Sequence, residues 1–496
     1  MTGADPIAAA LKAAGTDVCF GVPGGGVNLD LVGACERHGI RFVLTHTETA
    51  AVIAAGVWGE LTGRPGLALC TRGPGLAAAL NGIAQAHLDR QPVVVVTDGA
   101  GFEHPHQRVD HAAMVAPFSK GTVSDPEAAV ALALAPPWGP VLIDAGAPAR
   151  SAPSPAPARE PDPVVLPAAT RPVVLVGVAA RGSEAAIGEL VRGTGVPVLT
   201  TYKAKGAVPE SWPNAAGLLT GGTIEAPLLH DADLIVAVGL DPVELIPAPW
   251  PYAAPIVALM PWANPPGPLS PVAEYVGPLV RLLAGIELDG SAWERAGADY
   301  RRATLERLEI AGSGEGMSPH DVVRAIRRAL PAETVATVDA GAHMLVAMPL
   351  YEIDEPRRCL ISSGLATMGF SLPAAIAASL ATDAPVACLT GDGGLGMCLA
   401  ELETVVRLGR DLRVVVFDDA TLTLIAIKQG AGQGGEAAVR YGPVDFAAVA
   451  RGLGLPATTV TDGPSLEEAL HRPGPSLTSV QIDPSAYAAV LAATRA

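Results

Sequence analysis

The sequence predicts an α/β protein of three consecutive units, each a doubly wound parallel sheet with helices on both faces. Short runs rich in Val, Leu and Ile alternate with longer helix-like stretches along the whole chain. These runs are almost continuously apolar, which is typical of strands buried on both faces of a parallel sheet. The length of 496 residues suits about three domains of roughly 100 to 200 residues each.

The predicted strands occur in all three parts of the chain. The first part contains RFVLTHT (41–47), GLALCT (66–71) and PVVVVTD (92–98). The second contains PVVLVGV (172–178), VPVLTT (196–201) and LIVAVGL (234–240), and the third contains TVATVDA (334–340), APVACLTGDG (384–393) and LRVVVFDD (412–419). Amphipathic stretches between them predict the covering helices.

Two segments that lack these patterns separate the units. Residues 149–172 contain repeated proline, which fixes φ and removes backbone donors, so they are predicted to form an extended linker. The second segment, AGSGEGMSP at 311–319, follows a charged helical pattern over 293–309. It precedes a helix with Ser318 as N-cap and Pro319 at its first position. The predicted domains are therefore 1–160, 165–310 and 315–496.

Composition excludes several classes of protein. The net charge is −17 and no cluster of basic residues is interleaved with aromatic ones, so we expect no nucleic-acid partner. Mean hydropathy is +0.35, yet every apolar run is shorter than the roughly 18 residues of a membrane span, so no membrane partner is expected. The N-terminus shows no secretory signal, which predicts a cytoplasmic location. The six cysteines show no CxxC spacing and are expected to be structural.

The third unit contains a glycine-rich turn, Gly391-Asp392-Gly393-Gly394, between a buried strand and a helix expected to begin near Met397. Glycines allow backbone amides to approach a phosphate, and a carboxylate beside it suits Mg²⁺. Such a turn alone is weak, because Asp and Gly dominate turns for conformational reasons. The next strand ends in Asp418-Asp419, and 419 − 392 gives 27 residues, one strand-helix-strand crossover. We therefore expect Asp392 and Asp419 side by side at one sheet edge.

This pattern resembles the thiamine diphosphate-dependent enzymes of the acetolactate synthase, benzoylformate decarboxylase and benzaldehyde lyase group, whose signature is GDG followed by a strand ending in Asn-Asn. The resemblance implies pyrimidine-binding, central and diphosphate-binding domains, with thiamine diphosphate and Mg²⁺ as cofactors. It also implies that Asp392, the Asp419 side chain and the Thr421 carbonyl bind the metal. Two aspartates replace the asparagines here. Asp419 is a good substitute as a ligand, whereas Asp418 adds a charge of unknown purpose.

The beginning of the chain extends the resemblance. FGVPGGGVNLDLV (20–32) resembles the opening strand, turn and helix of the family, and residues 45–75 resemble the stretch that carries its single catalytic glutamate. Glu48 occupies that place. The family's glutamate hydrogen-bonds N1′ of the aminopyrimidine and promotes the imino tautomer, whose N4′ removes the C2 proton of the thiazolium. Without the resemblance, Glu48 would be an ordinary acidic residue in the first turn of a helix.

Other cofactor contacts follow from the resemblance. DAGAH (339–343) resembles a strand end that contacts the diphosphate, although a histidine there is often only a satisfied polar residue. Met368 takes the place of the apolar wedge under the bent cofactor, or is a core methionine. The Ala366 carbonyl and the Met368 amide take the places of two aminopyrimidine contacts. The expected cofactor-binding residues are Gly25, Ala340, Gly341, Ala342, His343, Ala366, Met368, Gly391, Gly393, Gly394 and Leu424.

Substrate contacts are less defined. In the family the substrate lies between the first domain of one subunit and the third domain of its partner, which implies at least a homodimer, with tetramers common. Arg72 could clamp a carboxylate or point into solvent. Leu424 and Ile427 are expected to face an apolar pocket, and the glycine-rich segment 430–442 is expected to be a mobile lid. The substrate candidates are Gly26, Arg72, His106, Gln107, His111 and Ile427.

The middle unit resembles the family's central domain through 200–210 and 233–244. Some relatives bind FAD or ADP there, but this chain lacks a convincing Arg- and Gly-rich pattern. We expect a structural role and no FAD.

The leading hypothesis is an acetolactate synthase-like enzyme that decarboxylates a 2-oxo acid, with or without carboligation. A non-decarboxylating hydroxyketone lyase of the benzaldehyde lyase type and a non-catalytic cofactor-binding subunit are the alternatives. The sequence leaves the donor, the acceptor, the stereochemistry and the need for a regulatory subunit open. A Rossmann oxidoreductase is disfavoured, because GVPGGG lacks the GxGxxG spacing.

Overall fold

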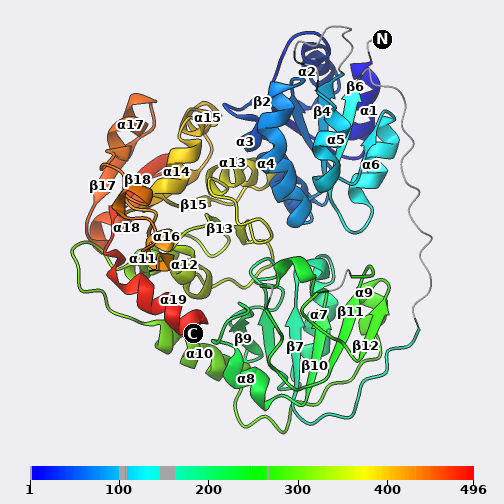
Figure 1. Cartoon of the computed structure of the whole chain (residues 1–496), viewed down its shortest axis with the longest axis vertical. Helices are drawn as coiled ribbons and strands as arrows, with labels where there is room; N and C mark the ends of the chain where they lie inside the picture. The colour runs from blue at the N-terminus through cyan, green and yellow to red at the C-terminus, as the bar shows by residue number, and fades with distance from the viewer. Residues whose placement is uncertain are drawn as a thin grey trace.

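The computed structural model describes residues 3–99, 107, 109–145, 162–246, 248–264, 267–430 and 432–495. Over these residues, three parallel six-stranded sheets follow one another along the chain, each covered by helices, as the sequence predicts. Figure 1 shows the first unit in blue and cyan, the middle unit in green and the third in yellow to red. Residues 149–161 of the predicted linker lie outside the described part.

The first sheet has the spatial order β2-β1-β3-β4-β6-β5, and all neighbouring strands are parallel. Leu67 and Leu69 of β3 face one core, and Ala68 and Cys70 face the other, as expected for a strand buried on both faces. Its strands are β1 (Val18–Val22), β2 (Arg41–Leu44), β3 (Gly66–Cys70), β4 (Val93–Asp98), β5 (Thr122–Val123) and β6 (Pro140–Ala145). Its helices are α1 (Ala4–Ala13), α2 (Val27–Arg37), α3 (Glu48–Thr62), α4 (Pro74–Leu88), α5 (His111–Val115) and α6 (Pro126–Leu134).

The middle sheet has the order β12-β11-β10-β7-β8-β9 and separates two hydrophobic clusters. Its strands are β7 (Pro172–Val176), β8 (Val198–Thr200), β9 (Ala215–Leu218), β10 (Leu234–Val238), β11 (Ile256–Met260) and β12 (Ala273–Val276). Its helices are α7 (Glu184–Val191), α8 (Ala226–Asp231), α9 (Leu279–Leu283) and α10 (Gly297–Leu308).

The third sheet has the order β14-β13-β15-β16-β18-β17, which is the same arrangement as in the first: second, first, third, fourth, sixth and fifth strand. Its strands are β13 (Val335–Val338), β14 (Cys359–Ile361), β15 (Val386–Gly391), β16 (Leu412–Asp418), β17 (Ala457–Val460) and β18 (Ser476–Gln481). Its helices are α11 (Pro319–Ala329), α12 (Met344–Leu350), α13 (Ser371–Ala381), α14 (Asp392–Cys398), α15 (Glu401–Leu408), α16 (Thr423–Lys428), α17 (Phe446–Gly452), α18 (Gly463–His471) and α19 (Tyr487–Arg495).

The first and third units meet through α3 and α13, which lie side by side at the centre of Figure 1. Buried residues of both helices and both sheets form one continuous hydrophobic cluster. Both helices are rich in Ala, whose small side chain allows two helix backbones to approach closely. This contact fixes the position of the two outer units relative to each other.

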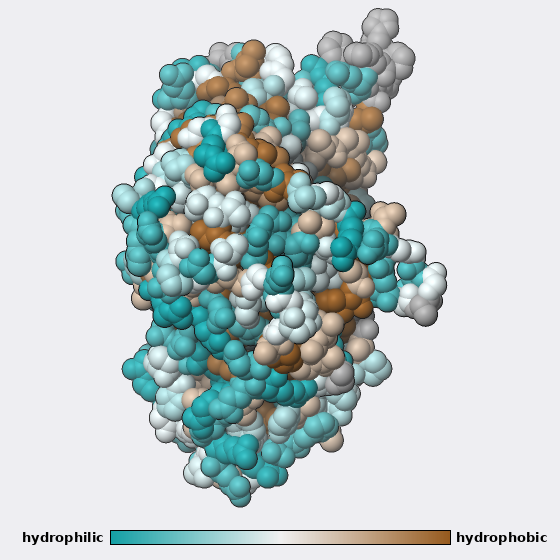
Figure 2. Space-filling view, turned by 90° about the vertical axis from the view of Figure 1, so that its left-hand side faces the viewer, coloured by the Kyte–Doolittle hydropathy of each residue, from teal (hydrophilic) through white to brown (hydrophobic). Residues whose placement is uncertain are grey.

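The helix α11 has a buried apolar face and a polar face. In α11, Val322, Val323 and Ile326 are buried, and Ser318 caps the helix by accepting a hydrogen bond from the His320 amide at 3.3 Å. Figure 2 shows the side of the molecule formed by the third unit, where hydrophilic residues predominate and hydrophobic ones gather in separate groups. Within the described residues, we find no helix that is both apolar enough and long enough to traverse a bilayer.

Candidate active site

A cavity of about 310 Å³ lies at the carboxyl end of the third sheet. Its walls come from the ends of β13, β15 and β16, the turn before α13, the helix α16 and the C-terminal helix α19. Every residue of the third unit that we expected to bind cofactor or metal lines it: Ala340, Gly341, Ala342, His343, Ala366, Met368, Gly391, Asp392, Gly393, Gly394, Asp419, Thr421 and Leu424. This edge of a parallel sheet is where α/β proteins bind ligands.

Asp392 and Asp419 lie side by side because β15 and β16 are parallel neighbours. Asp392 Oδ2 accepts a hydrogen bond from the Asp419 amide at 3.2 Å, and Asp419 Oδ1 accepts one from the Thr421 amide at 3.1 Å. Burial, assisted by the nearby Asp392 charge, raises the pKa of Asp419 to about 6. Burial also raises the pKa of Asp392. Two carboxylates that disfavour each other's charge are a suitable environment for a cation.

A cation at this pair would need further ligands. In the described part of the chain, no group of three or more His, Cys, Asp or Glu side chains is arranged to hold a metal ion. Mg²⁺ commonly uses one or two carboxylates and takes its other ligands from phosphate oxygens and water, which the two aspartates and a backbone carbonyl fit. Asp418 accepts a hydrogen bond from the Ser479 hydroxyl of β18 at 3.0 Å, so its side chain is engaged with the neighbouring strand.

The glycine-rich segment belongs to the helix that follows it. We expected a helix from about Met397, but α14 begins at Asp392, so Gly393 and Gly394 lie in its first turn. Glycine disfavours helices, so the start of this helix was predicted too late in the sequence. A Cβ on Gly394 would lie 2.2 Å from Asp339 Oδ2, so close packing, rather than helix propensity, accounts for glycine here.

Two buried polar groups on the cavity wall lack partners. His343 stacks on Phe417 with ring centroids 5.2 Å apart, and burial lowers the pKa of its imidazole to about 4. Among the described residues, neither His343 Nε2 nor the Tyr487 hydroxyl has a hydrogen-bond partner. Buried polar groups are rarely unsatisfied. The Tyr487 hydroxyl can donate to an acceptor, and His343 Nε2 can do so when it carries the proton of the imidazole. A ligand with several acceptor oxygens, such as a diphosphate, would satisfy both.

Asp339 connects the strand ends to the turn before α13. Its carboxylate accepts hydrogen bonds from the amides of Gly369 and Phe370 at 3.0 and 3.2 Å, and from the Thr390 hydroxyl at 3.1 Å. Burial raises the pKa of Asp339 to about 6, although these donors oppose the rise. This turn carries Ala366, whose φ of +54° is uncommon for a residue with a side chain. Such backbone strain is typical of functional sites.

Glu48 is the first residue of α3, and Thr47 caps the helix by accepting a hydrogen bond from the Ala50 amide at 3.1 Å. Gly75 of α4 leaves room for its carboxylate, because a Cβ there would lie 3.1 Å from Glu48 Oε1. Glu48 is not among the described residues that line the cavity of its own chain. The structure therefore separates the expected catalytic glutamate from the expected diphosphate site.

Other first-unit candidates also lie away from this cavity. Gly25 and Gly26 are exposed in the turn between β1 and α2, with open space where a side chain would be. Gln107 is exposed and has a φ of +56°. His106 lies outside the described residues.

Arg72 and His111 both interact with carboxylates of the first sheet. Arg72 Nε lies 2.6 Å from Asp98 Oδ2, and the Arg72 amide donates to Asp98 Oδ1 at 2.7 Å. His111 is buried, accepts a hydrogen bond from the Gly73 amide at 3.2 Å and places Nδ1 3.2 Å from Asp144 Oδ2. The Arg72 side chain is only 21% exposed, so it does not extend freely into solvent, and binding of a substrate carboxylate by Arg72 stays a prediction.

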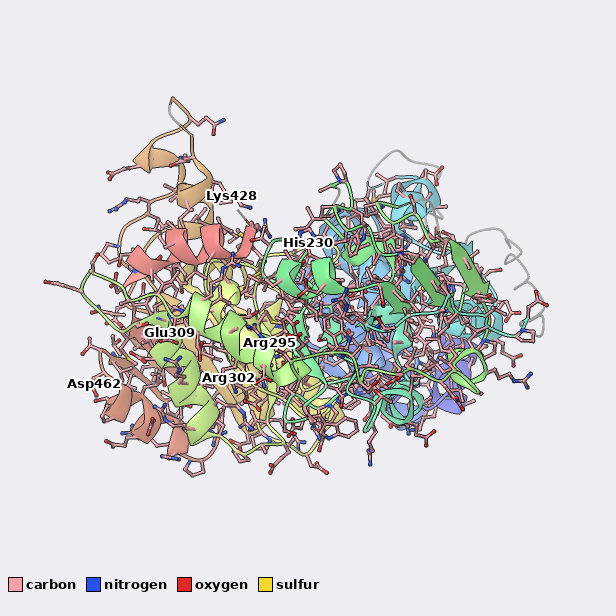
Figure 3. The ribbon with its side chains drawn as sticks, turned by 90° about the horizontal axis from the view of Figure 1, so that it is seen from below. His230, Arg295, Arg302, Glu309, Lys428 and Asp462 are labelled. Carbon is pink, nitrogen blue, oxygen red and sulfur yellow. The ribbon has the colours of Figure 1, made fainter. Side chains whose placement is uncertain are left out.

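The helix α16 presents a different face from the one expected. Leu424 lines the cavity, but Ile427 packs against the hydrophobic core of the third unit instead. Ile425 and Lys428 also line the cavity, and Lys428 lies three and four residues after Ile425 and Leu424, which places it on the same side of the helix as each of them. Lys428 lies at the end of α16, beside the C-terminal helix (Figure 3).

Several residues near the end of the chain that line the cavity were not predicted from the sequence. Ile482, Tyr487 and Arg495 line the cavity, and the Tyr441 hydroxyl hydrogen-bonds Asp392. No local motif marks these residues. The fold brings Ile482, Tyr487 and Arg495 to the site, because β18 lies beside β16 and α19 folds back across the edge of the sheet.

Comparison with known families matches all three units. The thiamine pyrophosphate enzyme N-terminal TPP binding domain matches residues 1–115, the central domain matches 165–259, and the C-terminal TPP binding domain matches 339–480. Thiamine pyrophosphate is another name for thiamine diphosphate. The chain belongs to the thiamine pyrophosphate enzymes.

Similar proteins cover almost the whole chain of this thiamine pyrophosphate enzyme. It is 27% identical to acetolactate synthase isozyme 1 large subunit of Escherichia coli (strain K12), over 97% of this chain and 94% of that protein. It is 27% identical to acetolactate synthase of Bacillus subtilis (strain 168), over 97% and 93%, and 28% identical to catabolic acetolactate synthase of Raoultella terrigena, over 97% and 95%. These matches support a thiamine diphosphate-dependent enzyme of the acetolactate synthase type.

Proposed function

We propose that this enzyme removes CO₂ from a small 2-oxo acid and either releases the remaining fragment or joins it to a second carbonyl compound. One observation carries the proposal: two acidic residues, two buried polar groups without a hydrogen-bond partner among the described residues, and an apolar wall converge on a single cavity. The relatives named acetolactate synthases support the same reaction class.

The third unit would hold the charged end of the cofactor. Asp392, Asp419 and the Thr421 carbonyl would bind Mg²⁺. The Tyr487 hydroxyl, and His343 Nε2 in the tautomer that is protonated there, would donate to the diphosphate oxygens. The bound cofactor supplies a nucleophilic carbon and accepts the electron pair that the departing CO₂ leaves behind. Gly394 of the glycine-rich turn is buried and Gly391 and Gly393 are half-buried, so this turn would limit the contact of the diphosphate with water and strengthen these polar contacts.

The remaining contacts would orient the rings and control a proton. The Met368 side chain would support the bent cofactor, and the Ala366 carbonyl and Met368 amide would bind its aminopyrimidine. The Glu48 carboxyl would hold a proton at N1′ of that ring. Glu48 does not line its own chain's cavity, so we propose that it acts in the site of a second copy. This requires at least a homodimer, and we propose a tetramer as its further assembly.

The substrate pocket would lie beside α16. Leu424 and Ile425 supply apolar walls that fit a short aliphatic side chain. Lys428 supplies a cation at the margin of the cavity, suited to the carboxylate of a 2-oxo acid.

The test is CO₂ release from pyruvate by the purified enzyme with thiamine diphosphate and Mg²⁺, beside Glu48→Gln. We expect release by the wild type and its loss in the variant, with acetolactate as product if carboligation follows. Turnover by Glu48→Gln close to wild type would contradict the proposed role of Glu48. Cleavage of a 2-hydroxyketone, without CO₂ release from any 2-oxo acid, would replace the proposal with a lyase activity.

A further inference from the structure

Two buried carboxylates accept hydrogen bonds across the interface between the first and third units. Asp89 follows α4 and is 1% exposed, and Glu401 begins α15 and is fully buried. Neither lines the cavity described above. Each accepts hydrogen bonds from two consecutive backbone amides of the opposite unit. Buried charges are costly unless they have such partners, so both contacts are specific features of the interface.

Asp89 holds the beginning of the turn that leads to α13. Its Oδ1 accepts hydrogen bonds from the amides of Ser363 and Gly364 at 3.1 and 2.9 Å. These residues come directly before the turn 366–368, which lines the cavity. A Cβ on Gly364 would lie 2.7 Å from Leu88 Cβ, so the close approach of this turn to α4 depends on glycine.

The same turn has a second attachment to the first unit. The Thr367 hydroxyl donates to Asn81 Oδ1 of α4 at 3.0 Å. The segment that would contact the aminopyrimidine is therefore anchored to α4 on both sides of Ala366. This explains how the structure maintains the positive φ of Ala366.

Glu401 holds the beginning of α3 in the same way. Its Oε1 accepts hydrogen bonds from the amides of His46 and Thr47 at 2.9 and 3.1 Å, directly before Glu48. Its Oε2 accepts one from the Thr404 hydroxyl at 2.9 Å. Burial raises the pKa of Glu401, and these three donors oppose the rise by favouring the ionised form.

The two contacts are reciprocal. In the shared strand order, β2 and α3 of the first unit correspond to β14 and α13 of the third. The two helices pack against each other, and the strand-to-helix junction before each one binds a carboxylate of the other unit. A movement at one junction must therefore strain the other.

The middle unit supplies the charge that Asp89 requires. Lys203 Nζ lies 3.8 Å from Asp89 Oδ2 and 2.8 Å from Glu60 Oε2, and Arg181 lies 2.7 Å from Glu60 Oε1. Gln85 Nε2 donates to Asp89 Oδ2 at 2.7 Å. All three units thus meet at the anchor of the 366–368 turn.

We propose that Asp89 and Glu401 are positioning residues for the two protein contacts with the aminopyrimidine, Asp89 through the turn 366–368 and Glu401 through Glu48. The inference rests on the proposed function. Because Glu48 and the turn of one chain then serve different cofactors in a dimer, the α3–α13 contact also connects two active sites.

The test measures exchange of the cofactor's C2 proton with deuterium at saturating thiamine diphosphate and Mg²⁺. We expect Asp89→Ala and Glu401→Ala to exchange about tenfold to a hundredfold more slowly than wild type, because small displacements of positioned groups have effects of this size. Asp89→Asn and Glu401→Gln keep an acceptor oxygen and should exchange within about threefold of wild type. For Glu401→Ala, the dissociation constant of the cofactor should change less than the exchange rate, since the diphosphate contacts remain.

Asp241→Asn is the matched control. Asp241 is a fully buried acid at the junction of the first and middle units, 2.8 Å from Arg90 Nε, with no contact to either strand-to-helix junction. It should lower the thermal midpoint without slowing exchange. If the alanine variants do not fold, Asp89→Glu and Glu401→Asp, which shift the carboxylate by one methylene, should show the slower exchange instead.

Two results would overturn the inference alone: wild-type exchange rates in Asp89→Ala and Glu401→Ala, or an equal slowing in Asp241→Asn. Absence of C2 exchange in the wild type would overturn the proposed function, and this inference with it.

Discussion

Gly394→Ala is expected to prevent cofactor binding, whereas Gly396→Ala, two residues later in the same helix, is not. The new Cβ at 394 would lie 2.2 Å from Asp339 Oδ2, and ordinary contact begins at 3.4 Å, so the carboxylate must retreat by about 1.2 Å. Asp339 now accepts hydrogen bonds from the Gly369 and Phe370 amides at 3.0 and 3.2 Å, and this displacement would break both. A hydrogen bond to a charged group contributes about 1.5–3 kcal/mol, so the loss is about 3–6 kcal/mol.

Gly396→Ala is the control, and its expected effect on stability has the opposite sign. A Cβ on Gly396 would meet nothing within 4 Å, and alanine in a helix is more favourable than glycine by about 0.5–1 kcal/mol. Calorimetric titration of each variant with thiamine diphosphate and Mg²⁺, together with the thermal midpoint, separates the two. Equal dissociation constants for both variants would refute the argument that close packing at Gly394 shapes the diphosphate site.

Three further outcomes are expected. Glu60→Gln should reduce stability at neutral pH by about 3 kcal/mol. Burial raises the pKa of Glu60, but the charges of Arg181 and Lys203 have a larger, opposite effect and hold the pKa at about 2 instead of 4.5. This stabilisation is complete above pH 4.5 and is lost as pH falls through about 2, so denaturation curves of wild type and variant should converge on acidification. Asp392→Asn should raise the Mg²⁺ requirement for cofactor binding by about tenfold or more, as metal titration would show; an unchanged requirement would argue against a ligand role. Lys428→Met should raise KM for the 2-oxo acid by up to about fivefold with kcat retained, because an exposed charge contributes little to binding energy. Steady-state kinetics that show a change only in kcat would exclude binding of the substrate carboxylate by Lys428.

The sequence predicted the α/β class and the third-unit residues that line the cavity, because short-range patterns indicate the first and short motifs that resemble the family indicate the second. Apolar strands such as β4 are recognisable by composition, and parallel pairing of β15 and β16 follows from one crossover. Once those strands are neighbours, Asp392 and Asp419 must meet at one edge. Spacing therefore predicted that Asp392 and Asp419 are neighbours, whereas their role as metal ligands follows from the family resemblance and stays a prediction.

Long-range packing accounts for what the sequence did not predict. The helix start at Asp392 depends on the contact of Gly394 with Asp339, which lies 55 residues earlier, since 394 − 339 gives 55. The roles of Tyr487 and Arg495 depend on the path of the last helix, and Ile427 faces the core because α16 packs against it. These are relations between distant segments, and no local pattern encodes them.

The shared strand order of the outer units also indicates why we propose the cation site in the third unit and not in the first. In both sheets, the ends of the third and fourth strands meet at the ligand-binding edge. In the third unit these ends carry Asp392 and Asp419, two carboxylates whose charges an external ion must balance. In the first unit the equivalent ends carry Arg72 and Asp98, which form an ion pair at 2.6 Å with Asp98 almost fully buried. The guanidinium supplies there the positive charge that we propose Mg²⁺ supplies in the third unit.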